Sequence, residues 1–350
     1  MRLDRFDYDL PRDLIAQEPA GRRDASRLLV LDRAADRLEE SRFEALGEHL
    51  APNDLMVIND TRVFPARLSS RKPTGGEVEL LLTERAPDEG GGQRWTCMVS
   101  TGRGLRPGLR LLIGPGLEAE ILEGGDGPRW LIRLIASAGD VDAAIARHGT
   151  MPLPPYIRRD PVDGRSSRDV ERYQTVYARQ SGAIAAPTAG LHFTPELLQR
   201  LEALGIGLAR LTLHVGPGTF QPVRAEEIEA HRLEPERFVL PDETAAAIDA
   251  CRARGGRVVA VGTTVTRVLE ARADDDRGVR AGEGRCDLYI TPGHRFRVVD
   301  ALVTNFHLPR STLLILAAAF AGRERILAAY REAVARRFRF YSYGDAMLIR

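Results

Sequence analysis

The feature of this sequence that most constrains its fold is a change of pattern near residue 66. Residues 66–148 carry 14 of the chain's 33 glycines, and glycine and proline separate a series of short apolar segments. Strands with this punctuation are typical of a small antiparallel barrel or sandwich. The segments lie at 77–82, 94–100, 109–114, 117–123 and 129–135. We therefore expect a β module here, and its 11 basic and 11 acidic residues give it no net charge for gripping RNA.

On both sides of this module, short apolar strands alternate with amphipathic helices, which is the pattern of an α/β domain. Before the module we predict strands at 27–31 and 54–58 and a helix at 37–50. After it, Thr194 caps a helix that has Pro195 at its first position and ends at Gly205. Further helices are predicted at 242–255, 263–272, 311–322 and 323–337, a polar loop at 274–284, and strands at 208–215, 257–261, 288–290, 296–304 and 338–343.

These patterns predict an α/β fold class. A mixed α/β main domain, residues 1–66 and 149–350, is split by an inserted small antiparallel β-barrel domain, residues 67–148. A length of 350 residues with 43% hydrophobic residues is enough for two domains with cores of their own.

Composition excludes several classes of function. With 50 basic and 49 acidic residues, the chain is not a globally basic nucleic-acid binder, so contact with RNA needs a local patch. Lys72 is the only lysine, which excludes a Walker A site. The sequence has no GxSxG elbow, HxxxH pair or CxxC pair, so we expect neither a serine hydrolase nor a metal site. We see no signal peptide and no membrane span, and three scattered cysteines suit a reducing cytoplasm.

Several polar or glycine-rich segments follow predicted strands, which is where ligands of open α/β sheets bind. Small residues at 182–191 precede His192 and lead to a helix N-terminus, which favours anionic groups. His214 ends another strand, just before the turn Gly216-Pro-Gly218. Helix caps, tight turns and structural histidines produce the same patterns, so this alternative stays open. Comparable segments lie at 59–67, 173–178, 261–267, 303–312 and 339–347.

Residues 321–350 hold seven arginines against three acidic residues, and aromatic residues interleave with them. Arginines that pair with phosphates and rings that stack on bases are typical of an RNA-binding patch. An amphipathic helix with a solvated basic face explains the pattern equally well.

Together these segments resemble one family, the S-adenosylmethionine:tRNA ribosyltransferase-isomerases of queuosine biosynthesis. The clearest matches are VINDTRVFPARL at 57–68, GAIAAPTAGLHFT at 182–194 and LTLHVGPGTFQPV at 211–223. The match is weakest at 69–148 and 274–285. The resemblance implies an α/β domain with an inserted β-barrel, in agreement with the pattern above. Other matching stretches lie at 6–19, 152–157, 173–178, 258–270, 302–314 and 341–348, so the likeness covers essentially the whole chain.

The resemblance also implies a reaction. The ribosyl part of S-adenosylmethionine is transferred and isomerised onto 7-aminomethyl-7-deazaguanine at the wobble position of tRNA. The products are epoxyqueuosine in tRNA, adenine and methionine. S-adenosylmethionine is then a consumed substrate, no cofactor or metal is needed, and the partner is the anticodon arm of tRNA. We further expect a cytoplasmic monomer that does not bind membranes.

This chemistry needs a base that removes a proton beside the sulfonium and an acid that assists the departure of adenine. Histidine suits both tasks, so His192 and His214 are the catalytic candidates, with Asp345 or Asp60 to orient a histidine. Tyr173 and Tyr177 are candidates for stacking on a base or facing the sulfonium. The remaining candidates for substrate binding are Asp60, Arg62, Thr188, Gly218, Thr219, Thr263, Thr264, Asn305 and His307.

Two other functions stay open at this point. An S-adenosylmethionine-dependent RNA methyltransferase would release S-adenosylhomocysteine, but no glycine-rich nucleotide fingerprint follows an early strand. A non-catalytic RNA-binding module would need a continuous basic face, and a net charge of +1 counts against it.

Overall fold

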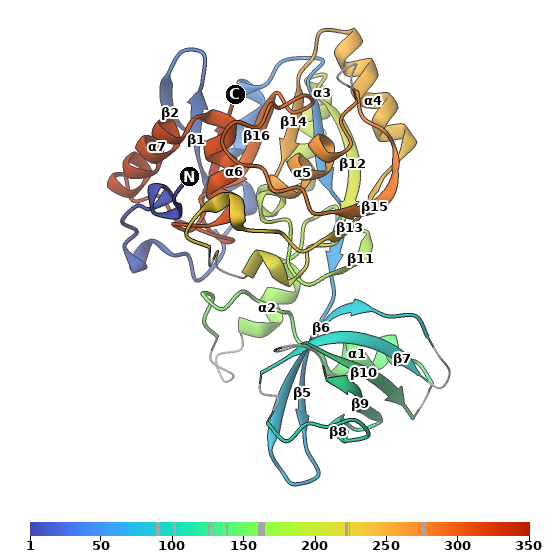
Figure 1. The fold of residues 1–350 in the computed structure, drawn as a ribbon. Helices are drawn as coiled ribbons and strands as arrows, with labels where there is room; N and C mark the ends of the chain where they lie inside the picture. Colours follow the sequence, from blue (N-terminus) through green and yellow to red (C-terminus); the bar gives the residue numbers. More distant parts are fainter. Residues whose placement is uncertain are drawn as a thin grey trace.

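The chain folds into an α/β domain and a β-barrel that is attached to one end of it (Figure 1). The predicted fold class is confirmed. The structure is a computed structural model, and it describes residues 1–88, 92–100, 103–124, 127, 129–137, 139–159, 165–220, 223, 225–274 and 278–350, apart from the side chains of residues 165–167, 219 and 220.

A mixed sheet with the strand order β15-β13-β12-β3-β14-β16-β17-β1-β2 forms the centre of the α/β domain. Strands β12, β3, β14 and β16 are mutually parallel, so their carboxyl ends lie along one edge of the sheet. The strands are β1 (Arg27–Asp32), β2 (Arg37–Arg42), β3 (Leu55–Asn59), β12 (Gly207–Leu213), β13 (Glu236–Leu240), β14 (Val258–Val261), β15 (Gly282–Cys286), β16 (Ala301–Asn305) and β17 (Ala346–Ile349).

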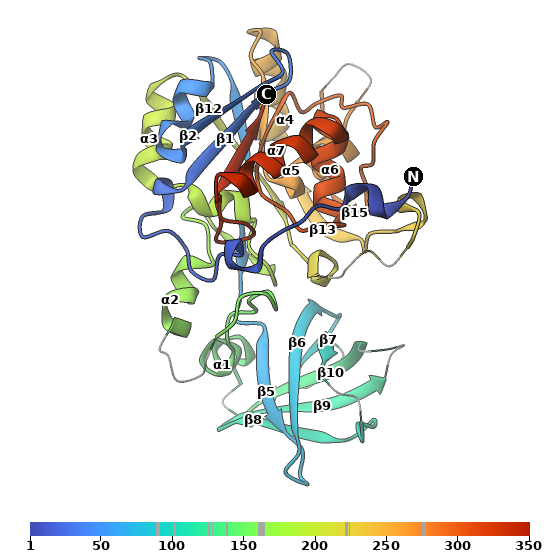
Figure 2. The same ribbon diagram turned by 90° about the vertical axis from the view of Figure 1, so that its left-hand side faces the viewer.

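Alternation along the buried strands divides the α/β domain into two cores. In β3, Val57 packs into one core, while Met56 and Ile58 pack into the other. Figure 2 shows α3 on one side of the sheet and α6 and α7 on the other. The predicted cap is present, because the Thr194 hydroxyl accepts a hydrogen bond from the Leu197 N–H. The helices are α3 (Pro195–Ala203), α4 (Asp242–Ala253), α5 (Thr263–Ala271), α6 (Thr312–Ala321) and α7 (Arg323–Ala335).

The inserted module closes into a barrel with the strand order β10-β7-β6-β5-β8-β9. Two helices, α1 (Val141–His148) and α2 (Arg165–Arg172), return the chain to the α/β domain. At the junction, β4 (Thr61–Val63) pairs in parallel with β11 (Gln180–Ala183). The predicted domain boundaries stay a prediction. The barrel strands are β5 (Arg67–Arg71), β6 (Glu77–Arg85), β7 (Gln93–Val99), β8 (Arg110–Gly114), β9 (Leu117–Gly124) and β10 (Arg129–Ala136).

Several local predictions are wrong or only partly right. The predicted polar loop 274–284 contains the first residues of β15, and the predicted strand 296–304 is β16, which begins only at Ala301. Residues 275–277 of the predicted loop lie outside the described residues. Residues 37–50 form no α-helix, because 37–42 pair as β2 with the open edge of β1 and only Phe43–His49 turns as a 3-10 helix. Residues 288–290 form no strand. The last strand is β17, and residues 338–343 form none. Tyr341 has a φ of 71°, which is not a strand conformation, and the aromatic rings of this segment are buried in the core. Within the described residues, no helix is long and apolar enough to cross a membrane.

Candidate functional site

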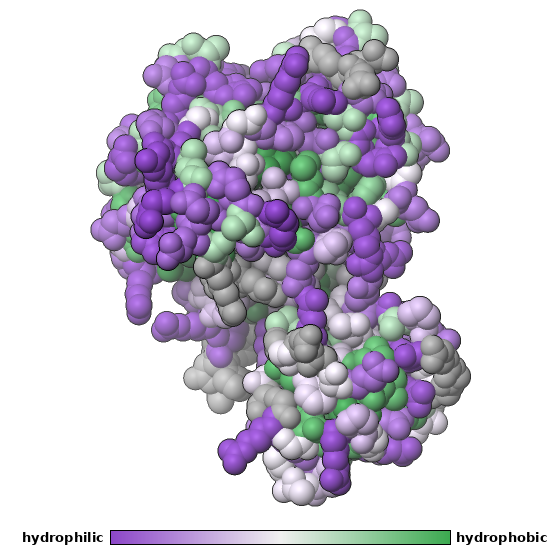
Figure 3. Space-filling model, viewed as in Figure 1, coloured by the Kyte–Doolittle hydropathy of each residue, from purple (hydrophilic) through white to green (hydrophobic). Residues whose placement is uncertain are grey.

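A large cavity lies between the barrel and the edge of the sheet where the parallel strands end. Its volume is about 920 Å³, which suits a ligand of nucleoside size and more. Figure 3 shows the molecular surface as two lobes of unequal size with a waist between them. The α/β side contributes Arg62, Ser181, Gly182, His214, Gly216, Glu234, Glu236, Arg237 and Arg285, while the barrel and its flanking segments contribute Phe64, Thr83, Glu84, Trp95, Arg129, Ile145 and Met151.

His214 is the histidine that the structure places in the wall of this cavity. It follows β12 directly, and its Nδ1 lies 2.8 Å from the Oγ1 of Thr61 on β4. Burial lowers the pKa of His214 and Arg237 lowers it further, while Asp60 raises it. The net direction keeps the imidazole neutral near pH 7, which is the state that accepts a proton.

A buried ion pair supports the turn after His214. Glu236 accepts a hydrogen bond from the Gly216 N–H at 2.8 Å through Oε1, and its Oε2 pairs with Arg267 of α5. Burial alone would lower the pKa of Arg267, but Glu236 holds it above its usual value. Arg267 is 5% exposed and Glu236 7%, so a charge left single here would be costly. The pair therefore fixes one wall of the cavity.

Another part of the wall is apolar. Phe64 and Trp95 lie with their ring centroids 5.4 Å apart, and Met151 and Ile145 also line the cavity. Aromatic side chains offer flat surfaces on which a nucleobase stacks. The cavity thus combines a polar wall around His214 with a wall that suits a base.

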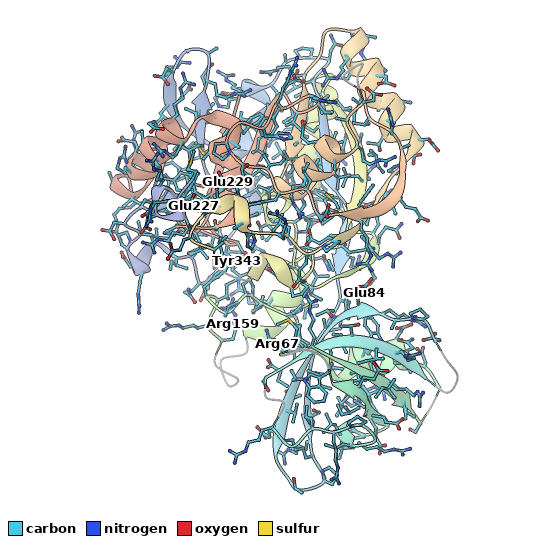
Figure 4. All side chains as sticks on the ribbon, viewed as in Figure 1. Arg67, Glu84, Arg159, Glu227, Glu229 and Tyr343 are labelled. Atoms are coloured by element: carbon cyan, nitrogen blue, oxygen red, sulfur yellow. The ribbon has the colours of Figure 1, made fainter. Side chains whose placement is uncertain are left out.

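Two ion pairs connect the two domains across the cavity. Glu84 of β6 pairs with Arg285 of β15, and Arg129 of β10 pairs with Glu234 of the α/β domain. Figure 4 places Glu84 at the end of the barrel that faces the α/β domain. All four side chains are between one third and about one half exposed, so each pair adds only about 0–1 kcal/mol. Their arginines also place positive charge at the rim of the cavity.

His192 belongs to a second cluster on the same edge of the sheet, where β1, β16 and β17 meet. Its Nδ1 lies 2.7 Å from Ser26 Oγ and its Nε2 3.2 Å from Asn305 Nδ2. Burial, and then Arg339 and Arg23, lower the pKa of His192 to about 3. It borders a pocket of only about 20 Å³, separate from the lining of the large cavity.

Asp345 and His307 lie in the same half of the edge. Both carboxylate oxygens of Asp345 accept backbone N–H groups, from Arg27 at 2.9 Å and Arg339 at 2.7 Å. His307 Nε2 lies 2.7 Å from the Thr304 hydroxyl, and burial lowers the pKa of His307 to about 3. These contacts tie loops together, and neither side chain lines the large cavity.

Arg62 is the one predicted substrate-binding residue whose described side chain lines the large cavity. Asp60 is its near neighbour and accepts a hydrogen bond from the Thr212 hydroxyl at 2.6 Å. Thr263 and Thr264 are buried at the start of α5, and Thr264 Oγ1 lies 3.4 Å from Asn59 Nδ2.

The other predicted residues have different surroundings. Tyr173 and Tyr177 are buried in the two cores of the α/β domain. Thr188 is half-buried at the start of the 3-10 helix Thr188–His192, and Gly218 borders a small cavity beside Arg267. The side chain of Thr219 lies outside the described residues.

The arginine-rich C-terminal segment is not an aromatic RNA-binding patch. Its rings are core side chains: Tyr330, Phe338 and Phe340 are fully buried. Some of its arginines pair with acidic residues, as Arg336 does with Glu332. On the face shown in Figure 3, hydrophilic side chains cover α7, which fits the solvated basic face.

Several cavity residues were not predicted from the sequence. Glu236 begins a strand, next to Arg237, where a charged pair is typical of a solvated position, and no motif surrounds Trp95. Thr61 lies in the segment 59–67, which the sequence analysis singled out. Its hydroxyl, next to Asp60 and Arg62, was the feature that could have marked it as a polar contact of the site. Within the described ranges, no group of three or more His, Cys, Asp or Glu side chains is arranged to hold a metal ion. The expectation of no metal stays a prediction.

The chain is similar over its whole length to proteins of known name. The sequence model of a family described as "Queuosine biosynthesis protein" matches residues 3–349. Proteins named S-adenosylmethionine:tRNA ribosyltransferase-isomerase from Anaeromyxobacter sp. and Geobacter metallireducens are 56% and 51% identical. These alignments cover 100% of this chain and 99% and 100% of those proteins.

A solved structure is similar as well. The crystal structure of an S-adenosylmethionine tRNA ribosyltransferase from Thermotoga maritima is 40% identical in sequence, with a TM-score of 0.55. The match covers 99% of this chain and 100% of that chain. The names of these relatives give no support to the methyltransferase alternative.

Proposed function

Because the chain belongs to the family of queuosine biosynthesis proteins, we propose that it is an S-adenosylmethionine:tRNA ribosyltransferase-isomerase. It moves the ribosyl group of S-adenosylmethionine onto the aminomethyl group of 7-aminomethyl-7-deazaguanine at the wobble position of tRNA. The group isomerises during transfer, and adenine and methionine leave. The protein works as a cytoplasmic monomer, and S-adenosylmethionine is consumed without a cofactor or metal.

The observation that carries the proposal is the cavity of about 920 Å³ that combines His214 with an aromatic wall. Both substrates present a base and a charged or polar group. The aromatic wall suits the base, and the polar wall around His214 suits the charged or polar group. The donor's sulfonium is positive, and the carboxylates of Glu234 and Glu236 line the same cavity. Arg62, Arg237 and Arg285 lie at the lining, where phosphates of the anticodon arm would contact them.

His214 is the acid–base group in this proposal. The positive sulfur makes the adjacent C5′ hydrogens acidic, and a neutral imidazole in the cavity wall removes one of them. The cavity is partly enclosed, so few waters compete for the developing charge. His192 and Asp345 stay candidates that act from the neighbouring cluster, where their contacts hold the strand ends in place.

A product assay tests the proposal. The enzyme is incubated with S-adenosylmethionine and tRNA that carries the 7-aminomethyl base, and the small products are separated by chromatography. Adenine and methionine in equal amounts support the proposal, S-adenosylhomocysteine would indicate a methyltransferase, and tRNA binding without products would indicate an RNA-binding module. His214→Ala should lower kcat about 100- to 10,000-fold. His231→Ala, which changes a histidine outside the cavity lining, serves as the matched control.

A further inference from the structure

The surroundings of His214 restrict which ring nitrogen carries the proton. Thr61 is fully buried, and its Oγ1 lies 2.8 Å from His214 Nδ1 and 3.4 Å from the carbonyl oxygen of Gln180. The β4–β11 pairing places Gln180 opposite Thr61, whereas His214 follows the end of β12, so the two neighbours of the hydroxyl come from different segments. The hydroxyl therefore sits between an imidazole and a carbonyl.

The count of protons decides the direction of these hydrogen bonds. A carbonyl oxygen only accepts, and a threonine hydroxyl has a single proton to donate. Both contacts are satisfied only if Thr61 donates to Gln180 and accepts from the Nδ1–H of His214. A neutral imidazole with its proton on Nδ1 has a lone pair on Nε2.

The second nitrogen has no such restraint. Within the described part of the chain, no hydrogen-bond partner is found for His214 Nε2, and the ring lines the cavity. Gly182 packs against the Nδ1 side of the ring, since a Cβ there would lie 2.7 Å from Nδ1 and 2.8 Å from Cε1. A side chain at this position would push the ring away from Thr61, so the glycine leaves the room that the contact needs.

We propose that Thr61 is a positioning residue that holds His214 as the Nδ1–H tautomer and so presents the Nε2 lone pair to the cavity. His214 then begins the reaction as a base rather than as an acid. The assignment of the tautomer rests on the geometry alone, whereas its role in turnover rests on the proposed function.

Nitrogen NMR of the free enzyme tests the tautomer without any substrate. The protein is labelled with ¹⁵N-histidine, and the signals of the seven histidines are compared with those of His214→Ala to identify His214. We expect a protonated Nδ1 and an unprotonated Nε2 in the wild type and in Thr61→Ser, which keeps the hydroxyl. Thr61→Val should shift the proton toward Nε2. A wild-type His214 that carries its proton on Nε2, or a tautomer unchanged by Thr61→Val, would overturn the proposal.

Kinetics test the consequence for turnover. Thr61→Val should lower kcat at least about tenfold with little change in the KM for S-adenosylmethionine, because the hydroxyl orients the base and does not touch the donor. Thr61→Ser should restore most of the loss. The control is Thr244→Val, which removes a buried hydroxyl that bonds the Arg210 carbonyl outside the cavity lining.

The two proposals fail in different ways. A wild type that releases no adenine contradicts the proposed function and leaves the NMR result intact. An active wild type whose kcat is unchanged in Thr61→Val contradicts the positioning role of Thr61. If Thr61→Val does not fold, the wild-type NMR spectrum still decides the tautomer.

Discussion

A methyl group added at Gly190 meets the hydroxyl of a buried tyrosine. The Cβ of an alanine there would lie 2.1 Å from Tyr177 Oη and 2.8 Å from Thr175 Cγ2. The first distance is 1.3 Å shorter than the 3.4 Å at which ordinary contact begins. Tyr177 is 7% exposed and packs edge-on against Phe193, so its ring has little freedom to move. Overpacking of this kind costs about 1–3 kcal/mol, and we expect Gly190→Ala to lie at the upper end.

Removal of the tyrosine oxygen should relieve part of this cost. Within the described residues, Tyr177 Oη has no hydrogen-bond partner, so Tyr177→Phe alone should change the free energy of unfolding little. In the Tyr177→Phe background the closest remaining contact is the one with Thr175 at 2.8 Å. Gly190→Ala should therefore cost about 1 kcal/mol less there than in the wild type.

Urea unfolding of the four proteins in this cycle measures the coupling. Far-UV circular dichroism follows the whole chain, while both tryptophans, Trp95 and Trp130, lie on barrel strands and report the barrel separately. The tryptophan transition should stay near its wild-type midpoint in all four proteins. Equal destabilisation by Gly190→Ala in both backgrounds would refute the steric explanation.

Three further predictions concern pH, salt and metal. Burial alone would raise the pKa of Glu270, but hydrogen bonds from His294 and from the backbone N–H groups of Arg297, Val298 and Val299 hold it below its usual value of 4.5. Glu270→Gln should cost about 1–3 kcal/mol at pH 7 in urea unfolding. The deficit should shrink as the pH falls from 4.5, where the unfolded chain takes up its proton, toward the lower pKa of the folded carboxylate. Between about 50 and 200 mM salt, the KM for tRNA should rise at least tenfold while that for S-adenosylmethionine changes little, because phosphate contacts release counterions. Dialysis against EDTA should leave kcat unchanged; a loss that Mg²⁺ or Zn²⁺ restores would contradict a metal-free reaction.

Local patterns were sufficient to predict most elements of the α/β domain and the barrel. Thr194 and Pro195 were sufficient to predict where α3 starts, because a cap acts on N–H groups within three residues. The barrel needed only alternating segments and glycine punctuation. The prediction of a helix at 37–42 was wrong because it, too, used only the local pattern. That pattern suits a helix, and the open edge of β1 that pairs with these residues is not visible in the sequence.

The candidate site shows the same division. The sequence indicated that polar side chains end several strands of one sheet, among them His192 and His214. It did not indicate that the two histidines lie in separate clusters, since that depends on the order of the strands, with β3 and β14 between β12 and β16.

By itself, the sequence determined most of the segments that become strands and helices, since periodicity, caps and turns act over a few positions. The tertiary structure alone decided that Trp95 of the barrel and His214 line one cavity and that Thr61 contacts the histidine ring. Those contacts join residues more than 100 positions apart, and they form only when buried apolar surface has brought the two domains and the strand ends together.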